Sequence, residues 1–477
     1  MKEHRLFDAI TDLPDGVVAE AEIKKPRRFR RWYIPAVAAA LALCFFLGSA
    51  LWPDGATIGM VANAAYLAEY PDRAQLANHD EPNYNTIYSK WSSENMSLAL
   101  PESYDKTAIE NFTRQSVVEF LGGSNGENRL YSPVNVYMVL AMLAEVTDGN
   151  SRRQVLELLG EESIDSLRRN VNTLWNNVYR NDGRSTVLLA NSIWMRDDIG
   201  YIDSTLKTLA ENYYASSFTG KMGSSDYNSA LRDWMNQNTK NLLKEQIDRL
   251  SMDKETVMAL VSTVYYKDRW SGIFKAENNT QDIFHTNSGD TTVTFMNQTS
   301  KGSTYYWSSN FSATVKYLGQ TRMWLVLPDE GVAPEELLED DIFWNTVQGK
   351  TGASSKVLEL KLSVPKFDIS DQTGLIDGIR NMGVTDVFET GQGDFSNLTN
   401  EWPAELLGDI EVSQITHGAR LKIDEEGAEG AAYTMILAGT TSAPQYDYAE
   451  LILDRPFIVV LTNTDNVPIF FGIVHNP

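Results

Sequence analysis

The chain has 477 residues, enough for one large domain or for two to three domains of average size. Its formal net charge of −23 argues against nucleic acid as a partner, because binding to a phosphate backbone needs a basic surface. The single cysteine, Cys44, excludes an intrachain disulfide and any cysteine-rich metal site. The five histidines are scattered and form no metal-binding motif, so no metal or other cofactor is expected.

The N-terminal segment has the composition of a membrane anchor. Residues 24–31 (KKPRRFRR) carry six positive charges, and residues 32–52 form an uncharged stretch of 21 residues. A stretch of this length spans a bilayer as a helix, and the cationic flank predicts a cytoplasmic tail over residues 1–31. The alternative is a cleaved signal peptide, which the long span and its aromatic end make less favoured. We therefore expect a single-pass protein of the cell membrane with its C-terminal part outside the cell, and the anchor together with the lack of disulfides favours a bacterial surface protein.

The part that follows divides into a spacer and one domain. Residues 53–104 are rich in Asp, Asn, Ser, Pro and Tyr and have no sustained periodicity, which predicts an extracellular stalk. Residues 105–477 are dense in expected elements and contain no obvious linker, which favours a single large domain.

The expected elements of this domain mix helices with strands. Residues 107–121 and 134–147 have the apolar spacing of helices, and Gly149 is expected to end the second one. Residues 186–195 and 256–266 are β-branched, nearly continuous apolar runs, typical of central strands buried on both faces. Five further segments predict strands: SATVKYLG (312–319), MWLVLPD (323–329), VLELKLSVPKFDIS (357–370), AELILDRPFIVVLTN (449–463) and VPIFFGIVHNP (467–477). The fold class is α+β, with several helices on large, mostly antiparallel or mixed sheets.

Residues 421–444 (LKIDEEGAEGAAYTMILAGTTSAP) have an unusual composition. If they form a strand, one face is small and uncharged, while Glu429 and Tyr433 lie on the other face. So little side-chain bulk packs poorly in a settled core strand, and the stretch lacks the turn chemistry of a settled loop. The pattern therefore indicates a segment that is a loop in one state and a strand in another. A flexible surface linker rich in Gly and Ala is the alternative, and this segment alone leaves both open.

The domain resembles the serpins, a family of serine protease inhibitors, along nearly its full length. The resemblance depends on strings that occur in the family's order and spacing: NRLYSPVNVYMVLAMLAEVTDGNSRRQVLELLG (128–160), LLANSIWM (188–195), VMALVSTVYYKDRWSGIFKAENNTQDIFH (257–285), LVLPDEG (325–331), VPKFDIS (364–370), GVTDVF (383–388), HGARLKIDEEGAEGAAYTM (417–435) and RPFIVVLTNTDNVPIFFGIVHNP (455–477).

The resemblance implies a mechanism. A protease cleaves an exposed reactive loop and forms an acyl-enzyme. The freed loop then inserts into the central sheet and traps the distorted protease, so the chain would be an inhibitor and not an enzyme. A non-inhibitory surface-binding protein on the same fold is the alternative.

The resemblance also assigns a hinge to the start of the loop. Glu425, Glu426 and Gly427 match the family's acidic-acidic-glycine start, and Ala428 is small and uncharged, as the residue that enters the sheet first must be. The small-residue hinge continues through these positions: Glu429, Gly430, Ala431 and Ala432.

The family spacing, counted from Glu425, places the scissile bond at Thr441–Ser442, and the count can shift by one or two residues. The neighbourhood contains no Arg or Lys, which disfavours trypsin-like proteases. Small residues suit a shallow specificity pocket, so the expected partners are serine proteases of elastase-like or subtilisin-like specificity. The expected form is a monomer.

A second set of residues matches positions that control opening of the sheet in serpins. Ser132, Asn135 and His417 match the polar cluster called the shutter, beneath the central strands. Ser262 stands where the family usually has asparagine, and Trp270 matches a tryptophan at the top of the sheet, where the loop first enters. A simple core histidine is the plainer interpretation of His417.

Short motifs of penicillin-binding proteins and β-lactamases also occur: Ser251-Met-Asp-Lys254, Ser308-Ser-Asn310 and Lys350-Thr-Gly352. In those enzymes the serine opens a buried helix, whereas the segment after Ser251 is strand-like. Such short matches arise by chance in a chain of this length, so an acyl-serine enzyme is a distant alternative.

Overall fold

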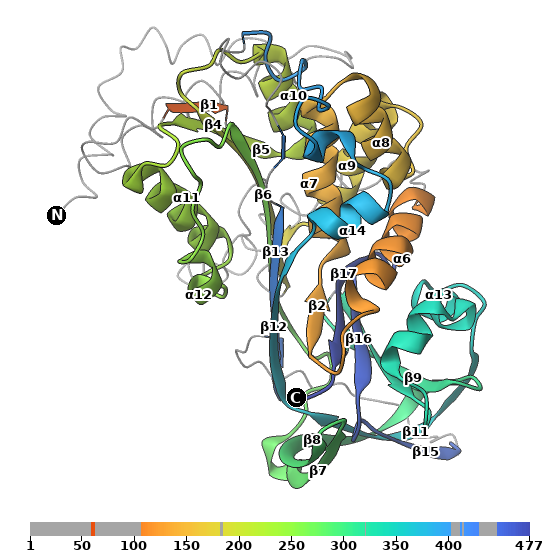
Figure 1. Cartoon of the computed structure of the whole chain (residues 1–477). Coiled ribbons are helices and arrows are strands. Elements are labelled where there is room, and N and C mark those ends of the chain that lie inside the picture. The colour runs from red at the N-terminus through yellow and green to blue at the C-terminus, as the bar shows by residue number, and fades with distance from the viewer. Residues whose placement is uncertain are drawn as a thin grey trace, which may run out of the picture. The chain divides into compact units, whose positions relative to one another are not determined.

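In the computed structural model, the described residues are 59–62, 106–181, 185–319, 321–401, 411–412, 415–428 and 446–477. They form two large sheets and several helices (Figure 1).

The first sheet, here called the main sheet, has eight strands among the described residues, in the order β1-β5-β4-β6-β14-β13-β12, with β3 beside β4. All neighbours are antiparallel except β4 and β5. The strands are β1 (Gly59–Ala62), β3 (Arg180–Asn181), β4 (Thr186–Arg196), β5 (Ala215–Gly220), β6 (Met258–Arg269), β12 (Phe367–Gly374), β13 (Thr416–Ile423) and β14 (Gly427–Ala428).

The second sheet has nine strands in the described part of the chain, in the order β15-β11-β8-β9-β10-β16-β17-β2, with β7 beside β8. Only β15 and β11 run parallel. The strands are β2 (Arg129–Tyr131), β7 (Thr280–Thr286), β8 (Gly289–Trp307), β9 (Phe311–Leu318), β10 (Thr321–Pro328), β11 (Ser354–Pro365), β15 (Tyr448–Ile452), β16 (Phe457–Thr462) and β17 (Pro468–Val474).

Helices cover both faces of the main sheet (Figure 1). On β4, Leu189 and Ile193 point into the large core around α7, whereas Ala190 and Trp194 point into a smaller core around α11. The helices are α6 (Thr107–Leu121), α7 (Pro133–Val146), α8 (Gly149–Leu159), α9 (Ile164–Val178), α10 (Asp203–Tyr213), α11 (Ser225–Asn238), α12 (Lys244–Ile247), α13 (Asp341–Val347) and α14 (Ile376–Asn381).

Helix α7 is apolar all round and almost completely buried, as expected of a helix in the centre of a core. Pro133 opens it at a position where a missing N–H does no harm, and the Ser132 side chain caps it by accepting from the Asn135 N–H at 3.4 Å. The helix therefore starts next to a residue that also belongs to the predicted shutter.

The predicted elements are largely confirmed. The helix at 107–121 has the expected bounds, and α7 lies one residue earlier than predicted. The role of Gly149 was predicted wrongly: α7 ends at Val146, and Gly149, at φ +55°, is the first residue of α8 behind the cap of Asp148. Asp148 is a favoured N-cap residue, and its signal for a helix start prevailed over the helix-ending signal of the glycine.

The N-terminal predictions are tested only in part. Within the predicted stalk, Gly59–Ala62 form β1 and pair with β5, so these four residues belong to the main sheet. None of the helices that the structure describes is both long and apolar enough to cross a bilayer. The predicted anchor at 32–52 and the tail at 1–31 lie outside the described residues.

Candidate functional site

The main sheet is parted between β6 and β13. On its β4 side, β6 is paired from Met258 to Lys267, but on the other side only Asp268 and Arg269 have a strand partner among the described residues. In the same way β13 pairs with β12 along its whole length, but only its last residue, Ile423, pairs with β14. The two facing edges are thus joined through β14 alone, which leaves the place of one strand between them.

A turn that we call the hinge turn, Asp424–Ala428, enters this place from one end. The Asp424 N–H donates to the Gly427 carbonyl at 3.0 Å, and the Asp424 carboxylate accepts from the Glu426 N–H at 3.0 Å. Ala428 is 1% exposed and lies between Asp268 and Ile423. The residue that was expected to enter the sheet first is therefore buried within it.

Gly427 is required by the backbone at this point. Its φ is +148°, and a Cβ there would lie 2.2 Å from the Asp268 carbonyl oxygen and 2.7 Å from the Arg269 Cα. Both neighbouring groups are backbone atoms of β6, so neither can rotate away. Any larger residue must push the hinge turn off β6.

A segment that we call the receiving loop, Trp270–Phe274, binds the hinge turn. The Trp270 N–H donates to the Glu426 carbonyl at 3.1 Å, and its indole Nε1 donates to the Asp424 carbonyl at 2.8 Å. The Phe274 N–H donates to the Glu425 carbonyl at 3.3 Å. Trp270, predicted to lie where the loop enters, thus contacts the hinge turn directly, whereas the part played by Phe274 was missed.

The side chain of Glu425 is fixed by groups that the sequence pattern did not single out. Its carboxylate pairs with Lys366 Nζ at 2.5 Å and accepts from the Asn279 amide. Burial alone would raise the pKa of Glu425, but the hydrogen bonds, above all the one from Lys366, outweigh burial and hold the pKa below its ordinary value. Lys366 stands 59 positions away in the sequence, and no periodicity connects it with the hinge.

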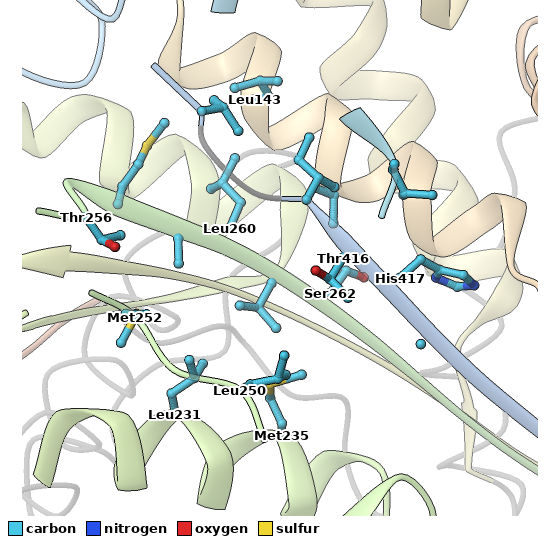
Figure 2. Close-up of a pocket in the computed structure, with 18 of the residues that line it drawn as sticks. Leu143, Leu231, Met235, Leu250, Met252, Thr256, Leu260, Ser262, Thr416 and His417 are labelled. Carbon is cyan, nitrogen blue, oxygen red and sulfur yellow. The ribbon is translucent and has the colours of Figure 1, made fainter. Parts of the chain in front are cut away.

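Between the parted strands lies a cavity of about 520 Å³ (Figure 2). Side chains of α7 such as Leu143 line one end, and side chains of α11 such as Met235 line the opposite end. Leu260 and Ser262 of β6 and His417 of β13 lie along it. The cavity explains why Met258–Ser262 are only half-buried, although their sequence resembles that of a strand covered on both faces.

The predicted shutter residues lie together at one side of this cavity. The Ser132 hydroxyl donates to the Ile469 carbonyl at 2.7 Å, and the Ser132 N–H donates to His417 Nε2 at 3.1 Å. Burial lowers the pKa of His417 to about 4, against a weaker opposing effect of Asp371. His417 is therefore neutral at pH 7, and because Nε2 accepts a hydrogen bond, its proton is on Nδ1.

Two polar atoms of residues that line the cavity, and a third on the neighbouring strand β4, have no hydrogen-bond partner among the described residues. They are Asn135 Oδ1, Ser262 Oγ and, on β4 directly opposite Ser262, Asn191 Oδ1. Buried polar atoms normally have a partner, and leaving one unpaired costs about 1–3 kcal/mol. The parted state is thus less satisfied than a state in which further polar groups enter the gap.

The remaining predicted site residues lie outside the described part of the chain. They are Glu429, Gly430, Ala431, Ala432, Thr441 and Ser442. The chain is described again from Tyr446, which leads into β15 at the edge of the second sheet.

The motifs of an acyl-serine enzyme are not assembled into a site. Lys350 pairs with Glu110 of α6 at 2.7 Å, and Asn310 donates to Asp340 at 2.8 Å. Ser251 lies exposed in the loop before β6 and does not open a helix. No hydrogen bond in the described residues joins any two of the three motifs, and Lys254, the lysine of the Ser251 motif, pairs with Glu255 at 3.3 Å.

Solved structures share this fold. The native-state crystal structure of tengpin, a thermophilic serpin, matches with a TM-score of 0.68 and 24% identity over 80% of this chain and 97% of that chain. A thyroxine-binding globulin in complex with thyroxine matches with a TM-score of 0.63 and 19% identity, over 78% of this chain and 99% of that one.

Curated relatives match at the level of sequence. An alpha-1-antitrypsin-like protein of Tamias sibiricus is 28% identical over 363 residues, which are 74% of this chain and 84% of that protein. The alpha-1-antiproteinase of Rattus norvegicus is 26% identical over 370 residues, or 75% of this chain and 86% of that one. The model of the family described as "Serpin (serine protease inhibitor)" matches residues 107–477, and the chain therefore belongs to the serpin family.

Proposed function

We propose that this protein is a suicide-substrate inhibitor of serine proteases. A protease cleaves the loop that follows the hinge turn and forms an acyl-enzyme, and the cleaved loop inserts between β6 and β13 and traps it. The observation that carries the proposal is the parted sheet: two facing strand edges joined only at Gly427–Ala428, with a cavity beyond them.

The register of the hinge supports insertion of the residues after Ala428. Ser262 lies six residues before Asp268 on β6, and His417 lies six residues before Ile423 on β13. Because β14 is antiparallel to both strands, continuing it from Ala428 brings the same residue, Thr434, opposite Ser262 and opposite His417. The Thr434 hydroxyl would then lie at the same height in the sheet as Ser262 Oγ, which has no partner among the described residues.

The side chains of the loop suit the two faces of the sheet. In an inserted strand Gly430, Ala432, Thr434, Ile436 and Ala438 share the face of Ala428, which is buried. Glu429 and Tyr433 take the opposite face. Each inserted residue adds backbone hydrogen bonds worth about 1 kcal/mol each, so a strand of about ten residues makes the transition effectively irreversible.

The proposed target class follows from the residues around Thr441–Ser442, which are small and uncharged. We propose elastase-like or subtilisin-like proteases as partners of a monomeric inhibitor.

The test is incubation of residues 53–477 with a pancreatic elastase and with subtilisin, followed by a denaturing gel. A covalent complex that survives denaturation supports the proposal, and mass spectrometry of the released C-terminal peptide locates the scissile bond. Cleavage without a complex would instead support the alternative, a non-inhibitory binding protein on the same fold.

Substitution of Ala428 separates trapping from cleavage. Ala428→Arg puts a long cation where the structure has a residue 1% exposed between two strands, so we expect cleavage to continue and the covalent complex to disappear. Ala333→Arg is the matched control, because Ala333 is exposed at the start of a short helix, Pro334–Glu339, that packs on α6, α13 and β10. Equal trapping by both variants would contradict insertion.

We also propose that residues 32–52 anchor this inhibitor in the membrane of its cell, with the serpin domain outside. Because Gly59–Ala62 of the predicted stalk belong to the main sheet, residues 53–58 are the part of it that separates the span from the sheet. The sequence supports the anchor with an uncharged span behind six positive charges. Extraction of membranes at alkaline pH tests it: an anchored chain stays in the pellet, and release of the full-length chain into the supernatant would rule the anchor out.

A further inference from the structure

Lys316, in the middle of β9, has its ammonium group against the receiving loop. Its Nζ lies 4.6 Å from the ring centre of Phe274 and 5.6 Å from the ring centre of Trp270. The same atom donates to the Gly272 carbonyl at 2.9 Å and to the Gln298 side chain on β8. One cation thus contacts the loop at three of its five residues.

The two rings that Lys316 contacts belong to the residues that bind the hinge turn. Trp270 and Phe274 pack edge to face, with ring centres 5.6 Å apart, and between them they donate all three hydrogen bonds that the loop makes to the carbonyls of residues 424–426. Trp270 is also bridged to Leu318 at the end of β9, and the Ser271 N–H donates to the Tyr317 carbonyl at 2.8 Å. The loop therefore stands between the β9 end and the hinge.

We propose that Lys316 is a positioning residue for loop insertion: its ammonium group holds the receiving loop in the shape that binds the hinge turn. Two hydrogen bonds and the position over two aromatic rings fix the ammonium group of Lys316. Its contacts with these rings and with the Gly272 carbonyl in turn fix the receiving loop. The part of the proposal that concerns inhibition depends on the proposed function. The part that concerns the loop does not.

The charge of Lys316 is the property that matters. Burial lowers the pKa of its amine to about 8, so the amine is still mostly protonated at neutral pH. A methionine of similar length would keep the contacts of the aliphatic stem, but it would lose the attraction to both rings and both hydrogen bonds. An arginine keeps the charge and stacks on aromatic rings, so it should restore the function.

The experiment compares Lys316→Met, Lys316→Arg and a matched control, Lys301→Met, in which an exposed lysine of the neighbouring strand β8 is changed in the same way. The first readout is amide hydrogen exchange of the uncleaved protein over peptides that cover residues 270–279 and 421–428. We expect exchange there to be roughly tenfold faster in Lys316→Met, in line with the loss of two cation–π contacts, and unchanged in the other two variants. Exchange of β16 and β17 in the same sample shows that the variant is folded.

The second readout is the number of inhibitor molecules consumed for each protease molecule trapped. A hinge turn that is released from the receiving loop starts insertion later. The number of inhibitor molecules consumed per trapped protease should therefore at least double in Lys316→Met and return to the wild-type value in Lys316→Arg. Faster exchange only in Lys316→Met supports the proposal. This holds even if the wild-type protein traps no protease, because that result would overturn the proposed function alone. Equal exchange in Lys316→Met and wild type, or equal damage by Met and Arg, would overturn it.

A second pair of variants covers the case in which Lys316→Met does not fold. Phe274→Leu removes one ring and leaves the cation in place, and it should also speed exchange of the receiving loop. The variant that combines Phe274→Leu with Lys316→Arg should match Phe274→Leu alone. Unchanged exchange in Phe274→Leu would show that the ring does not transmit the effect, and the proposal would fail.

Discussion

In the proposed mechanism, single residues of the hinge turn decide whether the loop can begin to enter the sheet, and Gly427 is the clearest case. A Cβ at Gly427 would meet backbone atoms of β6 at 2.2 and 2.7 Å in a left-handed backbone region. We expect Gly427→Ala to undock the hinge turn at a cost of about 1–3 kcal/mol, while the fold around it stays intact. The number of inhibitor molecules consumed per protease should rise severalfold. Gly374→Ala, where the added methyl group meets nothing within 4 Å, is the control and should behave like wild type.

His417 makes the stability of the shutter dependent on pH. Its folded-state pKa of about 4 lies below the ordinary value of 6.5, so as the pH falls below 6.5 protons bind to the unfolded chain before the folded one. Stability is therefore lost between about pH 6.5 and pH 4, by about 3 kcal/mol for this one group. Urea unfolding between pH 4 and pH 7 measures it. His417→Gln, which still accepts from the Ser132 N–H, should flatten the dependence of stability on pH. His285→Gln, at an exposed position, should not. Identical slopes of stability against pH in wild type and His417→Gln would refute the assignment.

At the scale of elements, local sequence predicted what forms but not what remains unpaired. The helix over 107–121 and the apolar strands followed from periodicity, because their burial depends on their own side chains. The half-buried stretch Met258–Ser262 has the same composition as a covered strand, and only the absence of a neighbour among the described residues distinguishes it. The site divides in the same way, because family motifs predicted Ser132, His417 and Trp270. Lys366 and Lys316 lie in other segments and are brought to the hinge only by the fold, and the bond from Phe274 to the hinge turn is likewise visible only in the structure.

The facing edges of β6 and β13 should be distinguishable by hydrogen exchange. In the uncleaved protein, the amides of residues 258–264 and 417–419 that point into the gap have no strand partner among the described residues, so we expect them to exchange quickly. After cleavage of the loop by subtilisin, an inserted strand should slow the same amides by a factor of about ten or more. Amides of β16, buried in both states, serve as the control. Slow exchange along both edges before cleavage would mean that the gap is already filled.

On the scale of the whole molecule, the proposed insertion requires that the native chain is not at its free-energy minimum. The open place between β6 and β13, the polar atoms without partners in the described part of the chain and the cavity of about 520 Å³ all represent interactions that a further strand would supply. A strand of about ten residues gains hydrogen bonds on two edges, on the order of 10 kcal/mol in total. For a chain of this size, that gain corresponds to a rise in melting temperature of about 10 °C.

Thermal unfolding of residues 53–477 before and after a single cut in the loop measures this gain. The cut chain should melt about 10 °C above the intact one, and Ala428→Arg, cut in the same way, should show little of this rise because its first inserted residue does not fit. Ala333→Arg, which leaves the gap untouched, should show the full rise after cutting. Equal melting of cut and intact wild-type protein would mean that the loop stays outside the sheet after cleavage, so the parted strands would store no free energy for trapping a protease.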